Sequence, residues 1–398
     1  MDNKEKQVKR HLESMKRSTS LAERKELERR SNERKAGQSK RGPRSRQQWG
    51  QADEDLDDFE SIRRAPKVRR DELARAVANR EDSQVDAPEE GDVDLLGLVL
   101  SVAPGRVRVR FERASGTLEE DAVLAEHLAR TQRSSVAVGD RVDLEEREDD
   151  SLRVRAVLTR GSSLSRPDPQ NPHLERVVAA NVDHAVIVAA VRNPDLRQRL
   201  IDRYLVAVQR GGVRPIVCAN KVDLLGDSAA RGEVDAILEV YRAIDVPVLF
   251  TSSETGEGIA ELRELLADST SVFVGQSGVG KSTLLNALLP ELGLVTGRVR
   301  TGDGKGRHTT TSSNLLEGED GARLVDTPGV RSFGLMDVTR ATLAGYFPEF
   351  AEHAPLCHFR DCSHVHEPNC AVQGAVEQDS LLAQRHQTYL RLFESLTA

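Results

Sequence analysis

The sequence lacks three features that would tie a protein to a membrane or to the secretory pathway. It contains no long run of apolar residues, no secretory leader pattern and no lipidation motif. We therefore expect a soluble, cytoplasmic protein without a membrane partner. Its 398 residues are enough for two to three domains.

Large apolar side chains are scarce in the first 92 residues. Residues 1–50 carry 16 Lys and Arg against 7 Asp and Glu, and residues 51–60 are strongly acidic. A segment of this composition cannot bury a core, so residues 1–92 are predicted to be a charged extension that is disordered when free. Its basic part has two interpretations, a solvated tail or an anchor for a phosphate backbone.

Cysteine is also rare, with four residues in the whole chain, yet three of them fall within 14 positions. Cys357, Cys362 and Cys370 surround His364 in the order Cys-x4-Cys-x-His-x5-Cys. Three thiolates and one imidazole are a tetrahedral zinc set. The alternative is a disulfide and a spare thiol, which a reducing compartment disfavours.

His358 and His366 lie close enough in sequence to compete for the fourth ligand position. A full set of four protein ligands leaves no position for a reacting water, so one structural zinc ion is expected. The fourth cysteine, Cys218, lies in an apolar run and is most simply a core residue.

A glycine-rich segment has the spacing of a phosphate-binding loop. It follows an apolar strand and precedes a helical segment, so its backbone amides and the positive helix end face the same anion. Lys281 is placed to reach the β and γ phosphates, and Ser282 to bind Mg²⁺. The nucleotide-binding residues predicted here are Gly275, Gln276, Ser277, Gly278, Val279, Gly280, Lys281, Ser282 and Thr283.

A second motif has the Asn-Lys-x-Asp pattern that recognises guanine. Its residues are Asn220, Lys221, Val222 and Asp223. The motif follows an apolar strand, and open α/β sheets bind ligands at the carboxyl ends of their strands. Asp223 is expected to accept hydrogen bonds from the guanine N1–H and amino groups, so GTP and GDP are the predicted nucleotides. Ser252, after the next strand, is expected in the loop that closes over the base.

The order of these motifs is unusual. An ordinary GTPase has the phosphate loop first and Asn-Lys-x-Asp last, but here the guanine motif precedes the phosphate loop. This is the order of a GTPase whose old termini were joined and whose chain was cut elsewhere. We therefore predict a circularly permuted P-loop α/β GTPase domain.

Two later segments predict the magnesium and γ-phosphate contacts. An apolar strand ends in Asp326-Thr-Pro-Gly329, where Asp326 is placed to hold the Mg²⁺ shell and the Gly329 amide to meet the γ-phosphate. Residues 306–311 offer hydroxyl groups for the switch I contact, and either Thr310 or Thr311 fits by spacing. The expected magnesium ligands are Ser282, Thr310 and Asp326.

Short strands dominate residues 93–160, which suggests an N-terminal OB-fold β-barrel that binds RNA. Apolar or alternating runs predict strands at 95–102, 106–111, 136–144 and 152–158. Arg106, Arg108 and Arg110 alternate on one of these strands. They form either a nucleic-acid surface or the wet side of a half-buried sheet.

Strand and helix patterns alternate after a proline-rich link at 166–172. The expected strands are 184–190, 213–219 and 247–251, and the expected helices are 196–210, 229–243 and 258–266. This alternation predicts a parallel sheet covered by helices, in a GTPase domain that spans 161–335. Residues 336–398 are predicted to form a C-terminal zinc-binding α-helical domain, with a helical tail at 375–396 packed on the zinc segment. The predicted fold is thus multidomain.

The whole pattern resembles one known family, the RsgA/YjeQ ribosome small subunit-dependent GTPases of bacteria. The resemblance covers about residues 95–396 and rests on the order of the barrel, the guanine motif, the phosphate loop, the two switch segments and the cysteine cluster. It implies binding to the small ribosomal subunit and its rRNA late in maturation, GTP hydrolysis stimulated by the subunit, and release. It also assigns nucleotide contacts to Asn220, Lys221, Asp223 and residues 275–283, and zinc contacts to Cys357, Cys362, His364 and Cys370. Residues 116–127 are more acidic than is usual for the barrel of this family.

One residue of Ras-like chemistry is absent. Such enzymes place a glutamine after Asp-x-x-Gly to orient water, whereas Gly329 is followed here by Val330. Intrinsic hydrolysis should therefore be slow. One hypothesis is that His308 positions the water when ribosomal RNA fixes switch I, and the alternative is that it only hydrogen-bonds the backbone. The expected catalytic residues are His308, Lys281 and Thr310.

Three classes of function are compatible with these motifs. They are an RNA-stimulated GTPase acting in assembly, an RNA-binding scaffold with a vestigial nucleotide site, and a GTPase acting on a protein or membrane partner. Intact Lys281, Ser282 and Asp326 favour the first over the second. The chain, expected to be a monomer, runs from switch II directly into the zinc segment, so the GTP state is predicted to hold the barrel and zinc domains in a subunit-binding posture.

Overall fold

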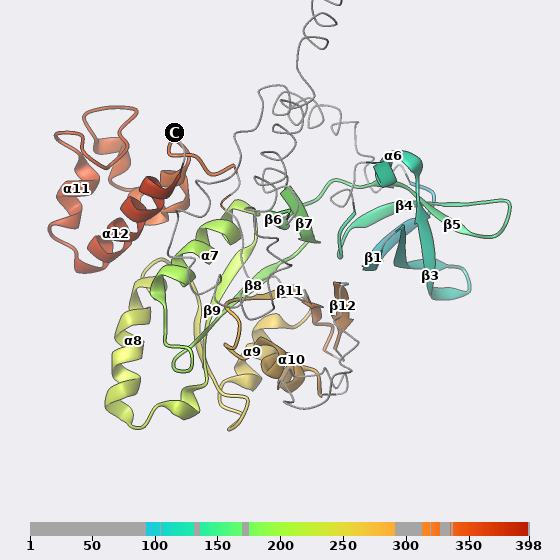
Figure 1. The fold of residues 1–398 in the computed structure, drawn as a ribbon, viewed down its shortest axis with the longest axis horizontal. Helices are drawn as coiled ribbons and strands as arrows, with labels where there is room; N and C mark the ends of the chain where they lie inside the picture. Colours follow the sequence, from blue (N-terminus) through green and yellow to red (C-terminus); the bar gives the residue numbers. More distant parts are fainter. Residues whose placement is uncertain are drawn as a thin grey trace, which may run out of the picture. The chain divides into compact units, whose positions relative to one another are not determined.

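Figure 1 shows the computed structural model of the chain. The structure describes residues 93–103, 105–130, 136–168, 175–290, 313–318, 320–326, 335 and 337–396. All of them belong to one compact unit, Pro66–Ala398. The predicted charged extension, residues 1–92, lies outside the described residues. None of the described helices is both long and apolar enough to span a membrane.

Five strands close into a barrel in the first described part of the chain. They are β1 (Leu96–Ala103), β2 (Arg106–Arg113), β3 (Gly116–Leu124), β4 (Arg141–Glu146) and β5 (Leu152–Val157). The pairings run β1–β2–β3–β5–β4, and β4 pairs back onto β1. A short helix, α6 (Glu126–Arg130), follows β3. The closed five-stranded arrangement is consistent with the predicted OB-fold.

Alternation of side chains explains how β2 forms. Val107, Val109 and Phe111 are buried in the barrel core, whereas Arg106 and Arg108 point to solvent. The strands predicted at 95–102, 106–111 and 152–158 are confirmed.

The other predictions for the barrel need correction. β3 escaped prediction because acidic residues fill it and Ala122 is its single buried side chain. The strand predicted at 136–144 begins only at Arg141, because the carboxylate of buried Asp140 accepts a hydrogen bond from the Ala137 amide and closes a turn there.

A hairpin stands where the sequence predicted a proline-rich link. Its strands are β6 (Ser163–Pro167) and β7 (Glu175–Ala180), which pair antiparallel. Pro167 ends a strand, where a missing amide hydrogen costs no ladder bond.

A six-stranded sheet forms the centre of the molecule. Five strands run parallel in the order β10 (Val248–Thr251), β9 (Arg214–Asn220), β8 (His184–Ala190), β11 (Thr270–Val274) and β13 (Arg323–Asp326). β12 (Asn314–Glu317) pairs antiparallel with β13 and also touches β1 of the barrel at Ser101 and Asn314. The strand predictions for this region are confirmed. β12 was not predicted from the sequence.

Helices cover both faces of this sheet, as predicted. They are α7 (Gln198–Arg210), α8 (Ser228–Arg242), α9 (Ile259–Leu266) and α10 (Lys281–Leu288). Residues of α7 and α8 share one core cluster with the sheet, and residues of α9 and α10 share the other. The carboxyl ends of the parallel strands therefore open at one edge between two helical layers.

The C-terminal part is a small helical unit around three aromatic rings. Phe347, Phe350 and Tyr389 pack with centroids 5.1–5.3 Å apart. The helices are α11 (Ala371–Val376) and α12 (Ser380–Ser395), preceded by three short 3₁₀ segments. The helical tail predicted at 375–396 is confirmed over most of its length, and α12 packs on the predicted zinc segment, where His386 and Tyr389 bond the carbonyl oxygens of His364 and Ser363. Asp379 separates α11 from α12, and its side chain accepts hydrogen bonds from the Leu381 and Leu382 amides as the N-cap of α12.

Candidate nucleotide site and metal centre

The glycine-rich segment forms a loop between β11 and α10. Three of its glycines have positive φ, with values of 144° at Gly275, 81° at Gly278 and 98° at Gly280. A Cβ atom on Gly275 would lie 2.3 Å from the Val188 carbonyl oxygen, and one on Gly280 would lie 2.5 Å from Asn220 Nδ2. Only glycine fits these two positions, so the loop brings its backbone close to its neighbours and to any ligand.

The first residues of α10 carry the predicted phosphate and magnesium groups. Lys281 Nζ donates to the carbonyl oxygens of Gly275 and Gln276, at 2.6 and 2.8 Å, so the ammonium group lies over the loop. Ser282 and Thr283 are exposed at the helix start. The positive end of α10, the backbone amides and the ammonium group together favour an anion.

Asn220 binds the guanine motif directly to the phosphate loop. It ends β9 with 2% of its surface exposed, and its Nδ2 donates to the Val279 carbonyl oxygen at 2.8 Å. The Thr251 hydroxyl donates to Asn220 Oδ1 at 3.1 Å, which fixes the orientation of the amide. Two segments that are 59 positions apart in sequence therefore meet as they do in an unpermuted GTPase site.

Lys221 joins a third segment to the same place. Its backbone is left-handed with φ 65°, and its ammonium group donates to Gly278 O at 2.6 Å and to Asn193 O. Burial lowers the pKa of Lys221 from its ordinary value. The loop after β8, the guanine motif and the phosphate loop are thus held by one side chain.

Asp223 and Ser252 form the predicted base-recognition corner. The Ser252 hydroxyl donates to Asp223 Oδ1 at 2.6 Å and accepts from the amides of Glu254 and Thr255 at 3.2 Å each. Asp223 is exposed, whereas Val222 is buried beneath it. A carboxylate oriented in this way, with one oxygen bonded to Ser252, can accept two N–H donors from one edge of a base.

The predicted hydrolysis and magnesium groups are mostly beyond the described part of the chain. His308, Thr310, Thr311 and Gly329 lie outside the described residues. The backbone of Asp326 ends β13, which pairs with the strand that leads into the phosphate loop. The assignment of these residues remains a prediction.

Sequence reasoning missed two supports of the nucleotide site. Thr251 orients Asn220, and its hydroxyl also lies 3.0 Å from Cys218 Sγ. Burial raises the pKa of Cys218 to about 12, so it stays a thiol in the core, as predicted. The other support is Asn193, which contributes only a carbonyl oxygen, and a backbone acceptor leaves no signal in a sequence.

The metal-type cluster assembles as predicted. One ligand atom each from Cys357, Cys362, His364 and Cys370 lies within 4.8 Å of all the others. Cys357 Sγ is 3.8 Å from Cys370 Sγ, and the His364 Nδ1 atom is 3.6 and 3.5 Å from these two sulfurs. Zinc–ligand bonds of about 2.3 Å to sulfur and about 2.0–2.1 Å to nitrogen give tetrahedral edges of about 3.8 and about 3.5 Å. The spacing fits a zinc ion and is far too long for a disulfide.

The acid–base character of the cluster points the same way. Burial raises the pKa of Cys362 to about 12 and also raises the pKa of Cys370. For Cys357, burial raises the pKa, but hydrogen bonds from the Val372 and Ala371 amides bring the net shift below its ordinary value. Burial lowers the pKa of His364 and keeps its imidazole neutral. Cys362 and Cys370 therefore need a cation beside them to become the thiolates that bind a metal, and the histidine is already in its ligand form.

Neighbouring residues fix the loop that carries His364. The Glu367 carboxylate accepts hydrogen bonds from the amides of Ser363, Val365 and His366. His358 packs its ring against Phe359 and, like His366, is outside the four-residue cluster.

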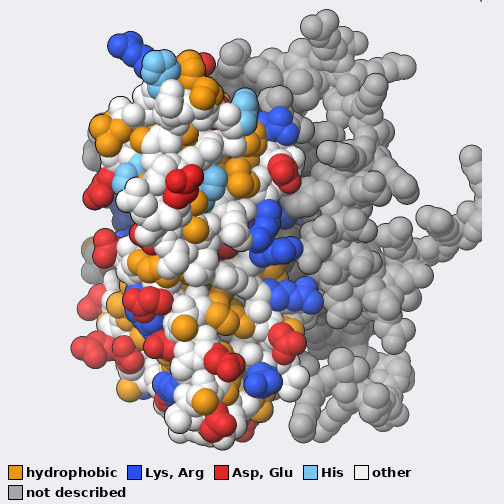
Figure 2. All heavy atoms as spheres, turned by 90° about the vertical axis from the view of Figure 1, so that its left-hand side faces the viewer, with side chains coloured by type: hydrophobic (Ala, Val, Ile, Leu, Met, Phe, Trp, Pro, Cys, Tyr) orange, Lys and Arg blue, Asp and Glu red, His pale blue; other side chains and the backbone are white. Residues whose placement is uncertain are grey.

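In the face shown in Figure 2, histidine side chains gather over the C-terminal unit and acidic ones are more frequent below it.

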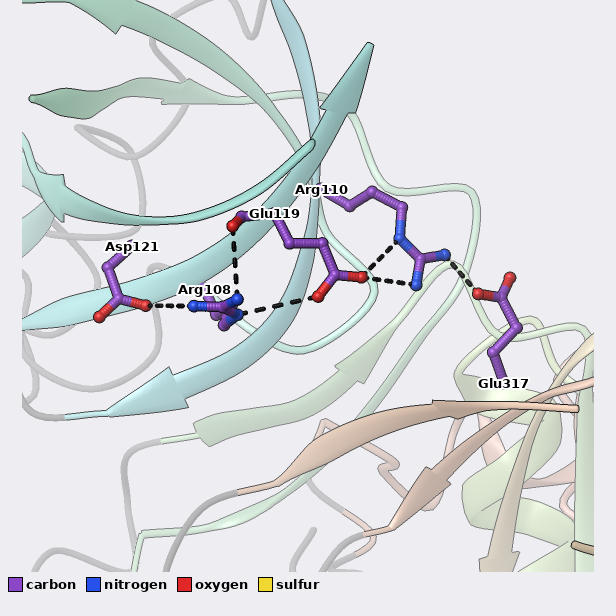
Figure 3. A network of polar contacts seen from close by, with 5 residues as sticks. All are labelled: Arg108, Arg110, Glu119, Asp121 and Glu317. Carbon is purple, nitrogen blue, oxygen red and sulfur yellow. Dashed lines mark hydrogen bonds and ion pairs between the residues drawn. The ribbon is translucent and has the colours of Figure 1, made fainter. Parts of the chain in front are cut away.

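Acidic partners on the neighbouring strand cover the alternating arginines of β2 (Figure 3). Arg106 pairs with Asp121. Arg108 pairs with Glu119 and Asp121, and Arg110 pairs with Glu119 at 2.8 Å. Arg110 also pairs with Glu317 of β12. Two acidic residues of segment 116–127, Glu119 and Asp121, are thus the partners of these arginines. This favours a charge-balanced sheet surface over a nucleic-acid surface.

The strand order and the joined loops define a circularly permuted P-loop GTPase. The profile of the RsgA GTPase family matches residues 157–336. The small ribosomal subunit biogenesis GTPase RsgA of Pseudomonas aeruginosa (strain LESB58) is 40% identical over 333 residues, which are 84% of this chain and 95% of that protein. The chain belongs to the RsgA family.

Solved structures agree with this assignment. YjeQ from Thermotoga maritima superposes with a TM-score of 0.61 and 33% identity, over 76% of this chain and 98% of the other. YloQ, described as a circularly permuted GTPase, superposes with a TM-score of 0.59 and 29% identity, over 78% of this chain and 98% of the other.

Proposed function

We propose that this protein is a GTPase that binds the small ribosomal subunit late in its maturation and leaves it after hydrolysing GTP. The observation that carries the proposal is the Asn220–Val279 hydrogen bond, which assembles a guanine motif and a phosphate loop into one site despite their reversed order. The names of the RsgA relatives support the small subunit as the partner. Contact with its rRNA by the basic extension, and by faces of the barrel other than the paired arginines of β2, belongs to the same proposal.

The described residues divide the nucleotide between them. Asp223, held by Ser252, takes the guanine N1–H and amino groups, and adenine offers no such donor pair. The loop amides and Lys281 take the phosphates. Mg²⁺, with Ser282, Asp326 and Thr310 as its proposed protein partners, would neutralise charge on the β and γ phosphates.

Hydrolysis is proposed to depend on the subunit. Val330 stands where a Ras-like enzyme has its water-orienting glutamine, so turnover by the free protein is slow. His308 is proposed to position the water once rRNA fixes switch I.

The metal centre is proposed to hold one structural zinc ion. Cys357, Cys362, His364 and Cys370 fill a tetrahedral set, which leaves no position for a reacting water. The proposed domains are an RNA-binding barrel at 93–160, the GTPase domain at 161–335 and the zinc domain at 336–398, in a cytoplasmic monomer.

The test is GTP hydrolysis by the zinc-loaded protein with and without purified small subunits. We expect strong stimulation, its loss in Lys281→Ala, and no change in Arg242→Met, a surface control on α8. Binding to subunits without turnover would replace the proposal by an RNA-binding scaffold with a vestigial nucleotide site. If the protein neither binds small subunits nor is stimulated by them, the small subunit is refuted as its partner.

A further inference from the structure

Helix α7 packs between the phosphate loop and the C-terminal unit that carries the metal centre. We propose that α7 couples the metal centre to the phosphate loop, with Asp202 and Arg385 as the joint, so that zinc and nucleotide strengthen each other's binding. The coupling rests on the nucleotide and zinc binding proposed above. The proposed coupling does not run through switch II, the segment that contains Asp326 and Gly329.

The N-terminal end of α7 lies beside the phosphate loop. The segment before the helix contains Asn193, whose carbonyl oxygen accepts from the same Lys221 ammonium group that holds Gly278. A cavity of about 20 Å³ is then lined on one side by α7 and on the other by Gln276 and Val279 of the phosphate loop. A shift of α7 along or across the sheet would therefore move the support of this loop.

The middle of α7 carries a buried carboxylate. Asp202 is 1% exposed, and its Oδ1 accepts from Arg385 Nη1 at 2.9 Å and from the Tyr241 hydroxyl at 3.0 Å. Its Oδ2 accepts from the Thr388 hydroxyl at 2.7 Å. Arg385 and Thr388 belong to α12, so the C-terminal helix holds α7 through both oxygens of one side chain.

The same stretch of α12 reaches the metal centre. His386, next to Arg385, donates from Nε2 to the backbone carbonyl oxygen of the predicted zinc ligand His364 at 2.8 Å. One turn on, the Tyr389 hydroxyl donates to the Ser363 carbonyl oxygen at 2.7 Å. Arg385 also donates from Nε to Glu349 Oε1 at 2.6 Å. Two helices and a buried ion cluster thus connect the zinc loop to the phosphate loop.

Burial makes this connection stiff. Arg385 is 2% exposed, and its guanidinium carbon lies 4.7 Å from the centre of the Phe347 ring. Water cannot replace a lost partner at such a site, so α12 and α7 move together or separate at high cost. Coupling between two binding sites is reciprocal in their equilibrium affinities, so nucleotide should tighten zinc binding by the factor with which zinc tightens nucleotide binding.

The experiment measures the zinc affinity of the full chain by equilibrium competition with a chromogenic chelator, with and without saturating GDP. A fluorescent GDP analogue measures nucleotide affinity in parallel, before and after zinc removal. Arg385→Met tests the joint. Arg242→Met is the matched control, because this arginine also pairs with two carboxylates, Asp235 and Glu239, but on the surface.

We expect GDP to tighten zinc binding at least about fivefold in the wild type and in Arg242→Met, and less than about twofold in Arg385→Met. The coupling is wrong if GDP binds the wild type and leaves its zinc affinity unchanged, or if Arg385→Met behaves as the wild type. If Arg385→Met does not fold, Thr388→Val serves instead. It removes the hydrogen bond to Asp202 Oδ2 and should reduce, but not abolish, the effect of GDP on zinc binding. Failure of the wild type to bind GDP would instead refute the proposed function, and the coupling with it.

Discussion

Two clusters of arginine and carboxylate groups connect the central sheet domain to its neighbours, and they differ in their exposure to water. Arg385 and Asp202, between α12 and α7, are 2% and 1% exposed. Arg110 and Glu317, between the barrel and β12, are 28% and 39% exposed, and the other arginines of β2 are more open still. The chemical groups are the same, but their energetic roles are not.

Exposure decides what each cluster can do. A buried charge that loses its partner cannot be solvated, so the α12–α7 cluster enforces one arrangement. An exposed pair exchanges its partner for water at little cost, so the β2 ladder contributes little stability and adapts easily. The protein therefore holds its metal-bearing unit rigidly and its barrel through contacts that can be remade.

The largest effect should come from removing zinc. Its loss should destabilise the C-terminal unit that holds the buried cluster and leave the barrel with its exposed pairs unchanged. Loss of the ion should withdraw on the order of 10 kcal/mol of folding free energy from the C-terminal unit. Hydrogen exchange should then quicken in α12 and stay unchanged in β1 and β2. Cys370→Ser should lower the zinc content, whereas Cys218→Ser should not, because Cys218 lies in the sheet core. Full zinc content in Cys370→Ser would contradict the ligand assignment.

The next effect concerns the buried cluster itself. Arg385→Ala should lower the free energy of unfolding by about 3–5 kcal/mol, because it leaves Asp202 and Glu349 buried without a cation. Urea denaturation measures this cost, which should change little with salt. Arg242→Ala, the surface counterpart, should cost less than about 1 kcal/mol. Similar costs for the two variants would remove the distinction between the clusters.

The smallest effect belongs to the exposed ladder. A double-mutant cycle on Arg110→Ala and Glu317→Ala should give a coupling energy of about 0.2–1 kcal/mol. Because both groups are solvent-exposed, this energy should fade at about 1 M salt. The pair Arg113–Glu146, which lies within the barrel, offers a matched cycle. A coupling above about 2 kcal/mol that resists salt would show that water does not reach this contact.

Sequence reasoning succeeded where chemistry is local. The phosphate loop and the cysteine cluster each fit within 14 residues or fewer, and fixed spacing is enough to predict that their residues come together. It failed for β3, because nearly every side chain of that strand faces water and leaves no apolar alternation. It also failed for Asp202 and Arg385, which are 183 positions apart. Each of these two looks like an ordinary surface charge on its own helix, and only the fold brings them together.

The bond from Asn220 to Val279 sets an order of events during synthesis. The guanine half of the site leaves the ribosome first, and its partner follows 59 residues later, after about 3–12 s at typical rates of elongation. During that interval the polar end of β9 has no acceptor at Val279, and no phosphate loop exists to hold a nucleotide. In the unpermuted order the phosphate half would be made first. The nascent protein thus cannot join the two halves of this site until Val279 has been made.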